Sequence, residues 1–249
     1  MASLKIVLAF CCLLLPDFVA RAGAGQTNVA VAANFTEPAR EIGALFAQKT
    51  GHQAIFSFGA SGQFYLQITQ DAPYQVLLSA DERRPKDAVE AGLAVPGSQF
   101  TYAIGTLVLW SRSLDLAKGD DVLRANAFNK LSIANPNAAP YGVAGIEAMK
   151  ALGVYDAIRP KIVQGNSIAQ AFQFVDTGNA ELGFVALSQL AGVSAGSRWI
   201  VPQALYRPIR QDAVLLKKGA TDDASVAFLA FLKGPEARAI VRKFGYALE

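Results

Sequence analysis

Short apolar runs alternate with amphipathic stretches along most of the chain, and this alternation limits the folds that the chain can adopt. The runs have the length and composition of β-strands. Between them, apolar residues recur at helical spacing, as in the set Phe35, Ala39, Ile42 and Phe46. Alternation of this kind is typical of parallel sheets covered by helices. The sequence therefore predicts an α/β fold.

The predicted elements fall into two groups. Three strand–helix units are followed by a strand-rich passage over 103–111, a second set of units, and a returning segment over 204–216. This order predicts two mainly parallel sheets joined by two crossings, with one lobe at 25–104 plus 208–249 and the other at 105–207. The predicted strands are Val29–Ala33, Ala54–Phe58, Val76–Leu78, Thr106–Trp110, Leu131–Ala134, Lys161–Val163, Leu182–Val185, Trp199–Val201 and Ala213–Leu216.

The N-terminus has the pattern of an export signal. Lys5 precedes the apolar run Ile6–Leu15, and small residues stand at Ala22 and Ala24. An apolar run this short does not form a stable membrane-spanning helix, which needs about 20 residues. We expect a signal peptide over 1–24, cleaved near Ala22 or Ala24, and a mature protein in the periplasm.

Composition excludes several classes of function. Both cysteines, Cys11 and Cys12, lie inside the signal, and a lipoprotein motif there is disfavoured because the bulky Phe10 stands where a small residue belongs. With one histidine, His52, the usual zinc and copper sites are not expected. After residue 22 the chain has 21 basic and 19 acidic residues, scattered and without a nucleic-acid-binding motif. We therefore expect no nucleic acid partner.

Four predicted strand-to-helix junctions carry groups that suit an anion. Ligands of open α/β sheets bind beyond the carboxyl ends of strands, where helix N-termini present free N–H groups. The first junction, 32–38, offers the side-chain donors of Asn34 toward the cleft. The Gly-rich second junction, 58–63, offers the hydroxyl and N–H of Ser61. Taken singly, these two also read as an ordinary helix cap and an ordinary glycine turn.

The other two junctions lie in the second half of the chain. In the Pro-punctuated junction 135–142, Tyr141 stands where the helix opens, and in junction 164–170 Ile168 presents its backbone N–H. A surface-packed tyrosine and a plain cap are the alternatives for these two. The four proposed contacts share one property, which is that none is a charged residue.

Neutral donors without an acceptor suit an anion that has lost all its protons. An anion that keeps a proton needs an acceptor facing it, and a carboxylate usually supplies that acceptor. The four junctions place no carboxylate at a proposed contact. Phosphate is therefore disfavoured, and a fully ionised tetrahedral oxyanion is favoured.

The chain resembles the periplasmic molybdate-binding proteins of ABC transporters over residues 28–248. The resemblance rests on the order of seven short motifs: AANFT at 32–36, FGASG at 58–62, LSAD at 78–81, NP at 135–136, PYG at 140–142, GFV at 183–185 and FLKGP at 231–235.

The resemblance implies a type II periplasmic-binding fold with molybdate or tungstate between two lobes. It places ligand contacts at Asn34, Ser61, Tyr141 and Ile168, and secondary contacts at Ala33, Phe35 and Ala60. It also implies that the protein is not an enzyme, has no cofactor, acts as a monomer, and delivers its ligand to an inner-membrane ABC permease when the lobes close.

The chain departs from the family pattern at two positions. One branch of the family has a tyrosine ligand where this chain has Ala186, so the tyrosine contact is assigned to Tyr141 as in the other branch. Family members usually have an aspartate before the run 77–81, near Gln75 here. If that aspartate holds a lobe or the hinge, its replacement loosens closure.

Two rival functions stay open. A binding protein of the same fold for sulfate or another small anion shares the donor chemistry, and cavity size alone would separate the two. A secreted hydrolase would need His52 in a catalytic triad, yet Gly51-His52-Gln53 is expected to be a solvated turn away from the four junctions.

Overall fold

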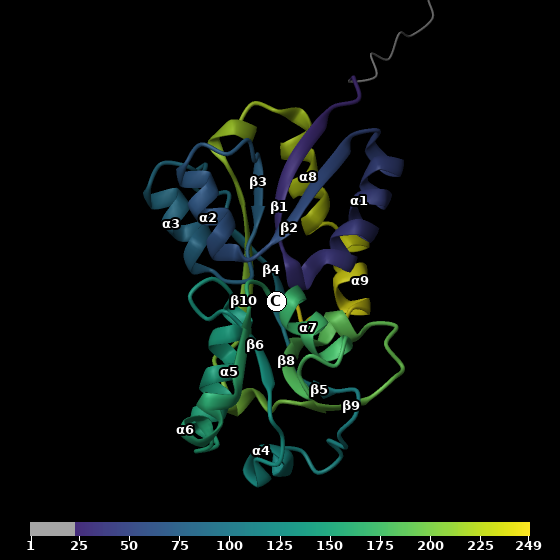
Figure 1. Ribbon diagram of the computed structural model, residues 1–249. Helices are drawn as coiled ribbons and strands as arrows, with labels where there is room; N and C mark the ends of the chain where they lie inside the picture. The colour runs from purple at the N-terminus through teal and green to yellow at the C-terminus, as the bar shows by residue number, and fades with distance from the viewer. Residues whose placement is uncertain (1–22) are drawn as a thin grey trace, which may run out of the picture.

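The computed structural model describes residues 23–249, which form an elongated molecule with one β-sheet in each half (Figure 1). The predicted signal peptide, apart from residues 23 and 24, lies outside the described residues. Within the described part of the chain, none of the helices combines the length and the apolarity that crossing a membrane requires.

The first sheet has five strands in the order β2-β1-β3-β10-β4. Strands β1, β2 and β3 are parallel, and β10 runs antiparallel to both β3 and β4. The last strand therefore returns from the end of the chain into a sheet built by its beginning. The bounds are β1 (Gln26–Ala32), β2 (Gln53–Gly59), β3 (Val76–Leu78), β4 (Phe100–Gly105) and β10 (Ile209–Leu215).

The second sheet repeats this plan in the order β7-β6-β8-β5-β9. Strands β6, β7 and β8 are parallel, and β5 runs antiparallel to β8 and β9. The bounds are β5 (Leu107–Ser111), β6 (Leu131–Ala134), β7 (Ile162–Gly165), β8 (Leu182–Ala186) and β9 (Ser197–Ile200). The predicted α/β fold with two mainly parallel sheets is confirmed.

The strand-rich passage differs from its prediction. The sequence predicted one strand, Thr106–Trp110, but the structure has two, β4 and β5, which belong to different sheets and are separated by Thr106 alone. Apolar periodicity does not reveal such a crossing, because buried residues of β4 and β5 stand on both sides of it and the apolar pattern continues through it. The chain crosses between the sheets here and returns between β9 and β10.

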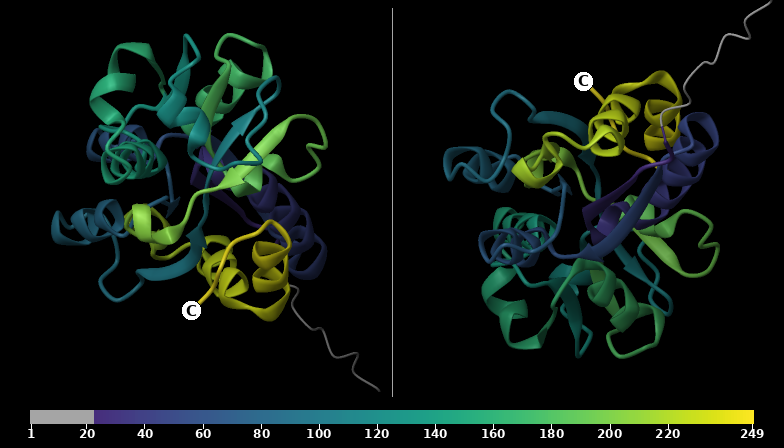
Figure 2. Two further views of the ribbon diagram at one scale, coloured as in Figure 1. Left: turned by 90° about the horizontal axis from the view of Figure 1, so that it is seen from below. Right: turned by 90° about the horizontal axis from the view of Figure 1, so that it is seen from above.

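Helices cover both faces of each sheet. Figure 2 shows α1, near the start of the chain, next to the yellow helices α8 and α9 from its end, while α2 and α3 lie on the other side of the first sheet. The α-helices are α1 (Thr36–Thr50), α2 (Ser61–Thr69), α3 (Arg83–Glu90), α4 (Asp121–Ala125), α5 (Pro140–Ala151), α6 (Tyr155–Ile158), α7 (Ile168–Asp176), α8 (Asp223–Lys233) and α9 (Pro235–Lys243). The 3₁₀ turns are η1 (Ala33–Phe35), η2 (Arg159–Lys161), η3 (Leu187–Leu190), η4 (Gln203–Leu205) and η5 (Lys217–Gly219).

Successive residues of β1 feed opposite cores, as the two-residue period of a strand requires. Val29 and Val31 pack with α1 and α8, whereas Ala30 packs with Phe64 of α2. Both faces of β1 are therefore buried, which explains its largely apolar sequence. The predicted apolar stripe of α1 is confirmed, since its members are all buried.

His52 does not occupy the solvated turn that the sequence predicted. The residue is only 8 % exposed, its ring lies against Phe46, and its Nδ1 accepts a hydrogen bond from the Gly25 N–H at 2.9 Å. The turn itself follows the prediction, because Gly51 ends α1 in the left-handed conformation. The histidine therefore ties the first described residues to the core.

Phe46 provides a test of the first core. Its fully buried ring contacts Phe228 and Phe231, so Phe46→Ala should lower the free energy of unfolding by about 3–5 kcal/mol. Leu66→Ala is the matched control, because Leu66 is 60 % exposed and its truncation should change stability by less than about 0.5 kcal/mol. Urea denaturation measures both, and equal losses would contradict this assignment of the core.

Candidate functional site

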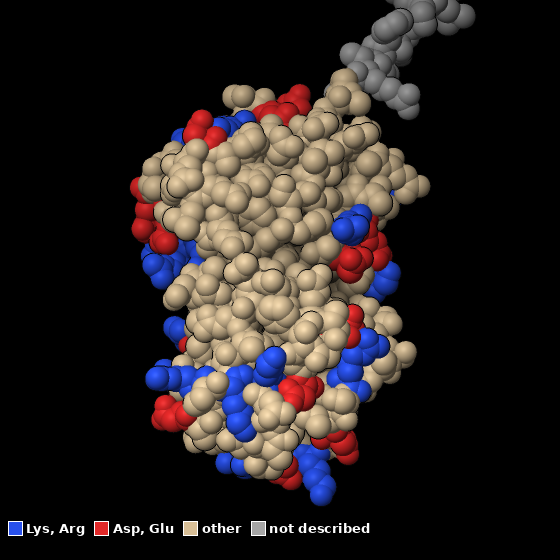
Figure 3. Space-filling model, in the orientation of Figure 1, with Lys and Arg blue, Asp and Glu red and all other residues tan. Residues whose placement is uncertain are grey.

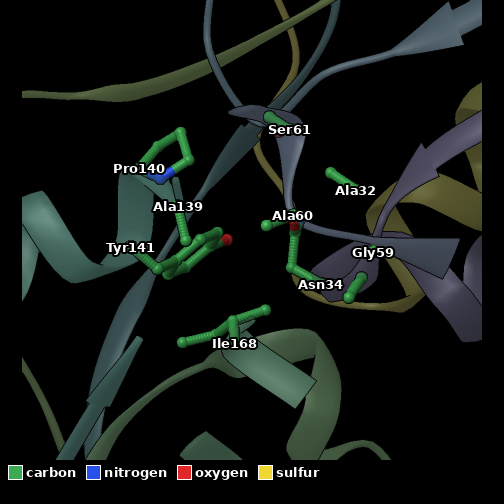
Figure 4. A pocket seen from close by; sticks show the side chains of 10 residues that line it. Ala32, Asn34, Gly59, Ala60, Ser61, Ala139, Pro140, Tyr141 and Ile168 are labelled. Atoms are coloured by element: carbon green, nitrogen blue, oxygen red, sulfur yellow. The ribbon is translucent and has the colours of Figure 1, made fainter. Parts of the chain in front are cut away.

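A small cavity of about 10 Å³ lies between the two sheets. Figure 4 shows its lining, which comes from both halves of the molecule. The lining residues are Ala32, Ala33, Asn34, Gly59, Ala60, Ser61, Ala139, Pro140, Tyr141 and Ile168. A space of this size is about that of one water molecule, so the cavity is nearly closed, and its lining contains no charged side chain.

Four helical N-termini meet at this cavity. Asn34 lies in η1, Ser61 and Ile168 are the first residues of α2 and α7, and Tyr141 is the second residue of α5. Backbone N–H groups in a first turn have no partner within their own helix, and the helix dipole places partial positive charge there. The cavity therefore combines hydrogen-bond donors with positive potential and needs no cationic side chain.

The structure brings most of the predicted contacts together. Asn34, Ser61, Tyr141 and Ile168 all line the cavity, and so do the secondary candidates Ala33 and Ala60. Phe35 does not belong to the lining. Its fully buried ring packs edge-on against Tyr102 and Tyr246 with centroid distances of 4.8 and 5.4 Å, so its side chain belongs to the core of the first half.

The Ser61 hydroxyl is held in place by one hydrogen bond. Its Oγ accepts the Ala80 N–H at 2.9 Å, and the residue is 1 % exposed. Because a hydroxyl that accepts one bond still carries its own hydrogen, Ser61 can donate into the cavity.

The Tyr141 hydroxyl comes from the opposite half and is buried as well. Burial, reinforced by the neighbouring Tyr246, Tyr102 and Tyr206, raises the pKa of Tyr141 well above its usual value of 10.0. The phenol therefore keeps its hydrogen at physiological pH. This group is a donor that does not depend on pH over the neutral range.

Asn34 differs from its prediction. The sequence predicted that its side-chain amide donates toward the cleft, but its Nδ2 donates to Gln211 Oε1 at 2.8 Å and to Tyr246 Oη at 2.9 Å. The backbone carbonyl oxygen of Asn34 accepts hydrogen bonds from the Ser188 and Tyr246 hydroxyls at 2.7 and 2.8 Å. Asn34 is therefore the centre of a buried network that fixes the shape of η1 behind the cavity.

No sequence pattern indicated the residues that surround Asn34. Gln211 on β10, Tyr246 after α9 and Ser188 in η3 are all buried, and the first two lie more than 170 positions from Asn34. In the sequence, Gln211 lies in an apolar strand, Tyr246 near the end of the chain and Ser188 in a turn. No local pattern identifies such partners, because they are brought together only by the return of the chain to the first sheet.

Hydrogen bonds between the two halves hold the cavity shut. Gly62 N–H at the start of α2 donates to the Ala138 carbonyl at 2.9 Å, and Arg84 Nη2 donates to the Asn137 carbonyl at 3.1 Å. Arg84 also pairs with Asp81, and both side chains are at least four-fifths buried. The opposite half covers this charged pair, as the bond from Arg84 to the Asn137 carbonyl shows.

Charged groups elsewhere on the visible surface are dispersed. On the face drawn in Figure 3, most of the upper half and the waist are uncharged, and charged side chains gather at the edges and over the lower half. Neither sign forms a continuous patch on this face. Long-range attraction of an anion therefore has no concentrated source there.

Gln75 supplies the acceptor that an aspartate would supply at the same place. Its Oε1 accepts the Asn28 N–H at 2.8 Å, and its backbone pairs with Asn28 and Leu216. An amide oxygen satisfies this N–H without adding a negative charge. Ala186, at the position of the alternative tyrosine, is fully buried at the end of β8.

Ser61→Ala tests whether the serine is structural as well as ligand-facing. The change leaves the buried Ala80 N–H without its acceptor, so it should lower the free energy of unfolding by about 1–3 kcal/mol. The exposed Ser113→Ala should change it by less than about 0.5 kcal/mol. Chemical denaturation without ligand measures both. An unchanged Ser61→Ala protein would mean that water replaces the hydroxyl.

Comparison with known proteins places these features in a family. Residues 27–247 match the model for bacterial extracellular solute-binding proteins. The molybdate-binding protein ModA of Rhodobacter capsulatus is 60 % identical over 92 % of this chain and 90 % of its own length.

Solved structures show the same relation. The periplasmic molybdate-binding protein of Azotobacter vinelandii superposes with a TM-score of 0.84 at 41 % identity, covering 90 % of this chain and 99 % of that one. The sulfate-binding protein SubI of Mycobacterium tuberculosis covers 89 % of this chain and 86 % of its own at a TM-score of 0.73, but its 14 % identity supports a shared fold alone. The matched family consists of solute-binding proteins, which excludes the hydrolase alternative. The chain belongs to the bacterial extracellular solute-binding protein family.

Proposed function

We propose that this protein binds molybdate, and tungstate as a second ligand, in the periplasm and delivers it to an inner-membrane ABC permease. The observation that carries the proposal is a cavity lined by neutral groups at four helix N-termini, in a chain 60 % identical to a protein named for molybdate binding. The predicted export signal supports the periplasmic location.

The proposed contacts are the hydroxyls of Ser61 and Tyr141 and first-turn N–H groups, including that of Ile168. A buried dianion loses its hydration and has to recover it through hydrogen bonds. Each bond to a charged acceptor contributes about 1.5–3 kcal/mol, and each helix terminus adds up to about 1 kcal/mol. Several such contacts can offset the loss of water without a counter-ion.

Lobe closure is the proposed signal to the permease. We assign the lobes to residues 25–104 with 208–249 and to residues 105–207, and we propose that the protein acts as a monomer. The contacts of Gly62 and Arg84 with the opposite half favour the closed form. A bound anion adds donors from both lobes to these contacts, so occupancy and closure are linked.

Calorimetric titration of the mature protein with molybdate, tungstate, sulfate and phosphate tests the proposal. Molybdate and tungstate should bind at least about 100-fold more tightly than sulfate, a difference of about 2.7 kcal/mol. The physical basis is cavity size, because these anions share charge and shape but differ in radius. Equal or tighter binding of sulfate would contradict molybdate as the ligand, and phosphate should bind weakest because the site lacks an acceptor.

The pH dependence of binding provides a second test. The raised pKa of Tyr141, caused mainly by burial, keeps its hydroxyl protonated through and beyond the neutral range. Molybdate affinity should therefore be constant within about twofold from about pH 7 to about pH 9. Calorimetry in buffers of equal ionic strength measures it. A decline centred within this interval would show that a group with a lower pKa controls the site.

A further inference from the structure

Gln211 is a fully buried polar residue that lies behind the cavity without lining it. It sits on β10, where the pairing with β4 shifts register between Gln211 and Asp212. The partners on β4 skip from Ala103 to Thr101 across this step, so the bulge lies in β4 and Tyr102 is its extra residue. The Gln211 side chain, opposite this bulge, reaches groups from both halves of the molecule.

The amide of Gln211 has a fixed orientation. Its Oε1 accepts a hydrogen bond from Asn34 Nδ2 at 2.8 Å and lies 3.1 Å from the Tyr102 hydroxyl, which shares its one hydrogen with the Ser79 carbonyl at 3.1 Å. Both neighbours are donors, so the amide oxygen faces them. The amide nitrogen consequently faces the other way, and its Nε2 donates to the Tyr141 hydroxyl oxygen at 3.4 Å.

This donation determines which way the Tyr141 hydroxyl can act. A hydroxyl carries one hydrogen, and that hydrogen cannot point at Gln211 while the oxygen accepts from it. Tyr141 lines the cavity, and its hydroxyl has two side-chain neighbours, Gln211 Nε2 and the Tyr246 hydroxyl. Because the Tyr246 oxygen already accepts from Asn34 Nδ2, a charged guest in the cavity is the better acceptor for the Tyr141 hydrogen.

Gly105 makes the contact possible. This glycine ends β4 beside the crossing between the sheets, and a side chain there would overlap the Tyr141 hydroxyl and approach Gln211 Nε2 to 2.7 Å. The close approach of the two groups depends on a residue without a Cβ. The bulge and the glycine that accommodate this contact therefore both lie in β4.

We propose that Gln211 is a positioning residue that commits the Tyr141 hydroxyl to donate into the cavity, and so favours an anion that presents acceptors alone. The inference rests on the proposed function and deepens it. A protonated anion would need Tyr141 to accept its hydrogen, which would leave the tyrosine hydrogen without an acceptor. Gln211 does not line the cavity, yet through Tyr141 it disfavours the binding of protonated oxyanions.

A double-mutant cycle with Gln211→Met and Tyr141→Phe tests the role. Methionine matches the length of glutamine and removes its hydrogen bonds. Gln211→Met should weaken molybdate binding about tenfold when Tyr141 is present and less than about twofold in the Tyr141→Phe background, because the two residues act as one unit. Equal weakening in both backgrounds would overturn the proposal.

Two further variants separate positioning from structural effects. Tyr102→Phe removes the hydroxyl next to Gln211 Oε1 but leaves the contact between Gln211 Nε2 and Tyr141. Molybdate affinity should therefore change less than about threefold. Gln211→Glu places an acceptor opposite Tyr141, which should turn the tyrosine hydrogen away from the cavity and weaken binding more than about 100-fold. Binding by Gln211→Glu at the level of the natural protein would contradict the proposal, provided that circular dichroism shows a folded protein.

The cycle is measured with whichever of molybdate and sulfate binds the natural protein more tightly. A preference for sulfate would overturn the proposed ligand and leave the test of Gln211 intact. Additive effects with molybdate would overturn the role of Gln211 and leave the proposed ligand intact.

Discussion

The convergence of four helical first turns between two sheets is the constraint on which the rest of the structure depends. Each first turn has N–H groups that its own helix cannot satisfy. Residues of η1 and of the first turns of α2, α5 and α7 line one small cavity, although some of their N–H groups, such as that of Gly62, bond to protein carbonyls. An anion suits the N–H groups that remain, because it accepts from several directions and is favoured by the dipoles.

The position of the sheets follows from how the chain crosses between them. Strands β4 and β5 are separated by one residue, so the two sheets are joined within a single stretch of chain. The return through β10 brings Gln211 under η1 and beside Tyr141. The return crossing between β9 and β10 therefore supplies the buried amide behind the cavity.

Closure and binding use neighbouring residues. Gly62 follows Ser61 in α2 and donates across to Ala138, which lies three residues before Tyr141 in the sequence. A side chain at Gly62 would meet Arg84 and the Ala138 backbone at about the limit of contact, with 2.9 and 3.0 Å separations. The halves can approach this closely because position 62 has no Cβ. Contacts that shut the cavity and contacts that face it thus belong to the same short loops.

The relation to other solute-binding proteins separates fold from ligand. Structures named for sulfate and for iron share this architecture at 14 % and 15 % identity. A shared fold does not by itself specify the ligand. In this chain the cavity lining carries hydroxyl and backbone groups, and Arg84, next to it, is engaged with Asp81 and Asn137.

Local sequence patterns were enough to predict the α/β alternation and the strand-to-helix junctions. They also predicted uncharged contacts at Ser61, Tyr141 and Ile168, because all these features arise from residues close together in the chain. Other features became visible only in the folded chain. Phe35 packs in the core, His52 is buried, and Arg84 and Asp81 are covered. The Asn34 amide faces Gln211 and Tyr246. Each of these depends on a partner from a distant segment. Local periodicity reports which face of an element is apolar, but the direction of a buried polar group is set by whatever the returning chain places opposite it.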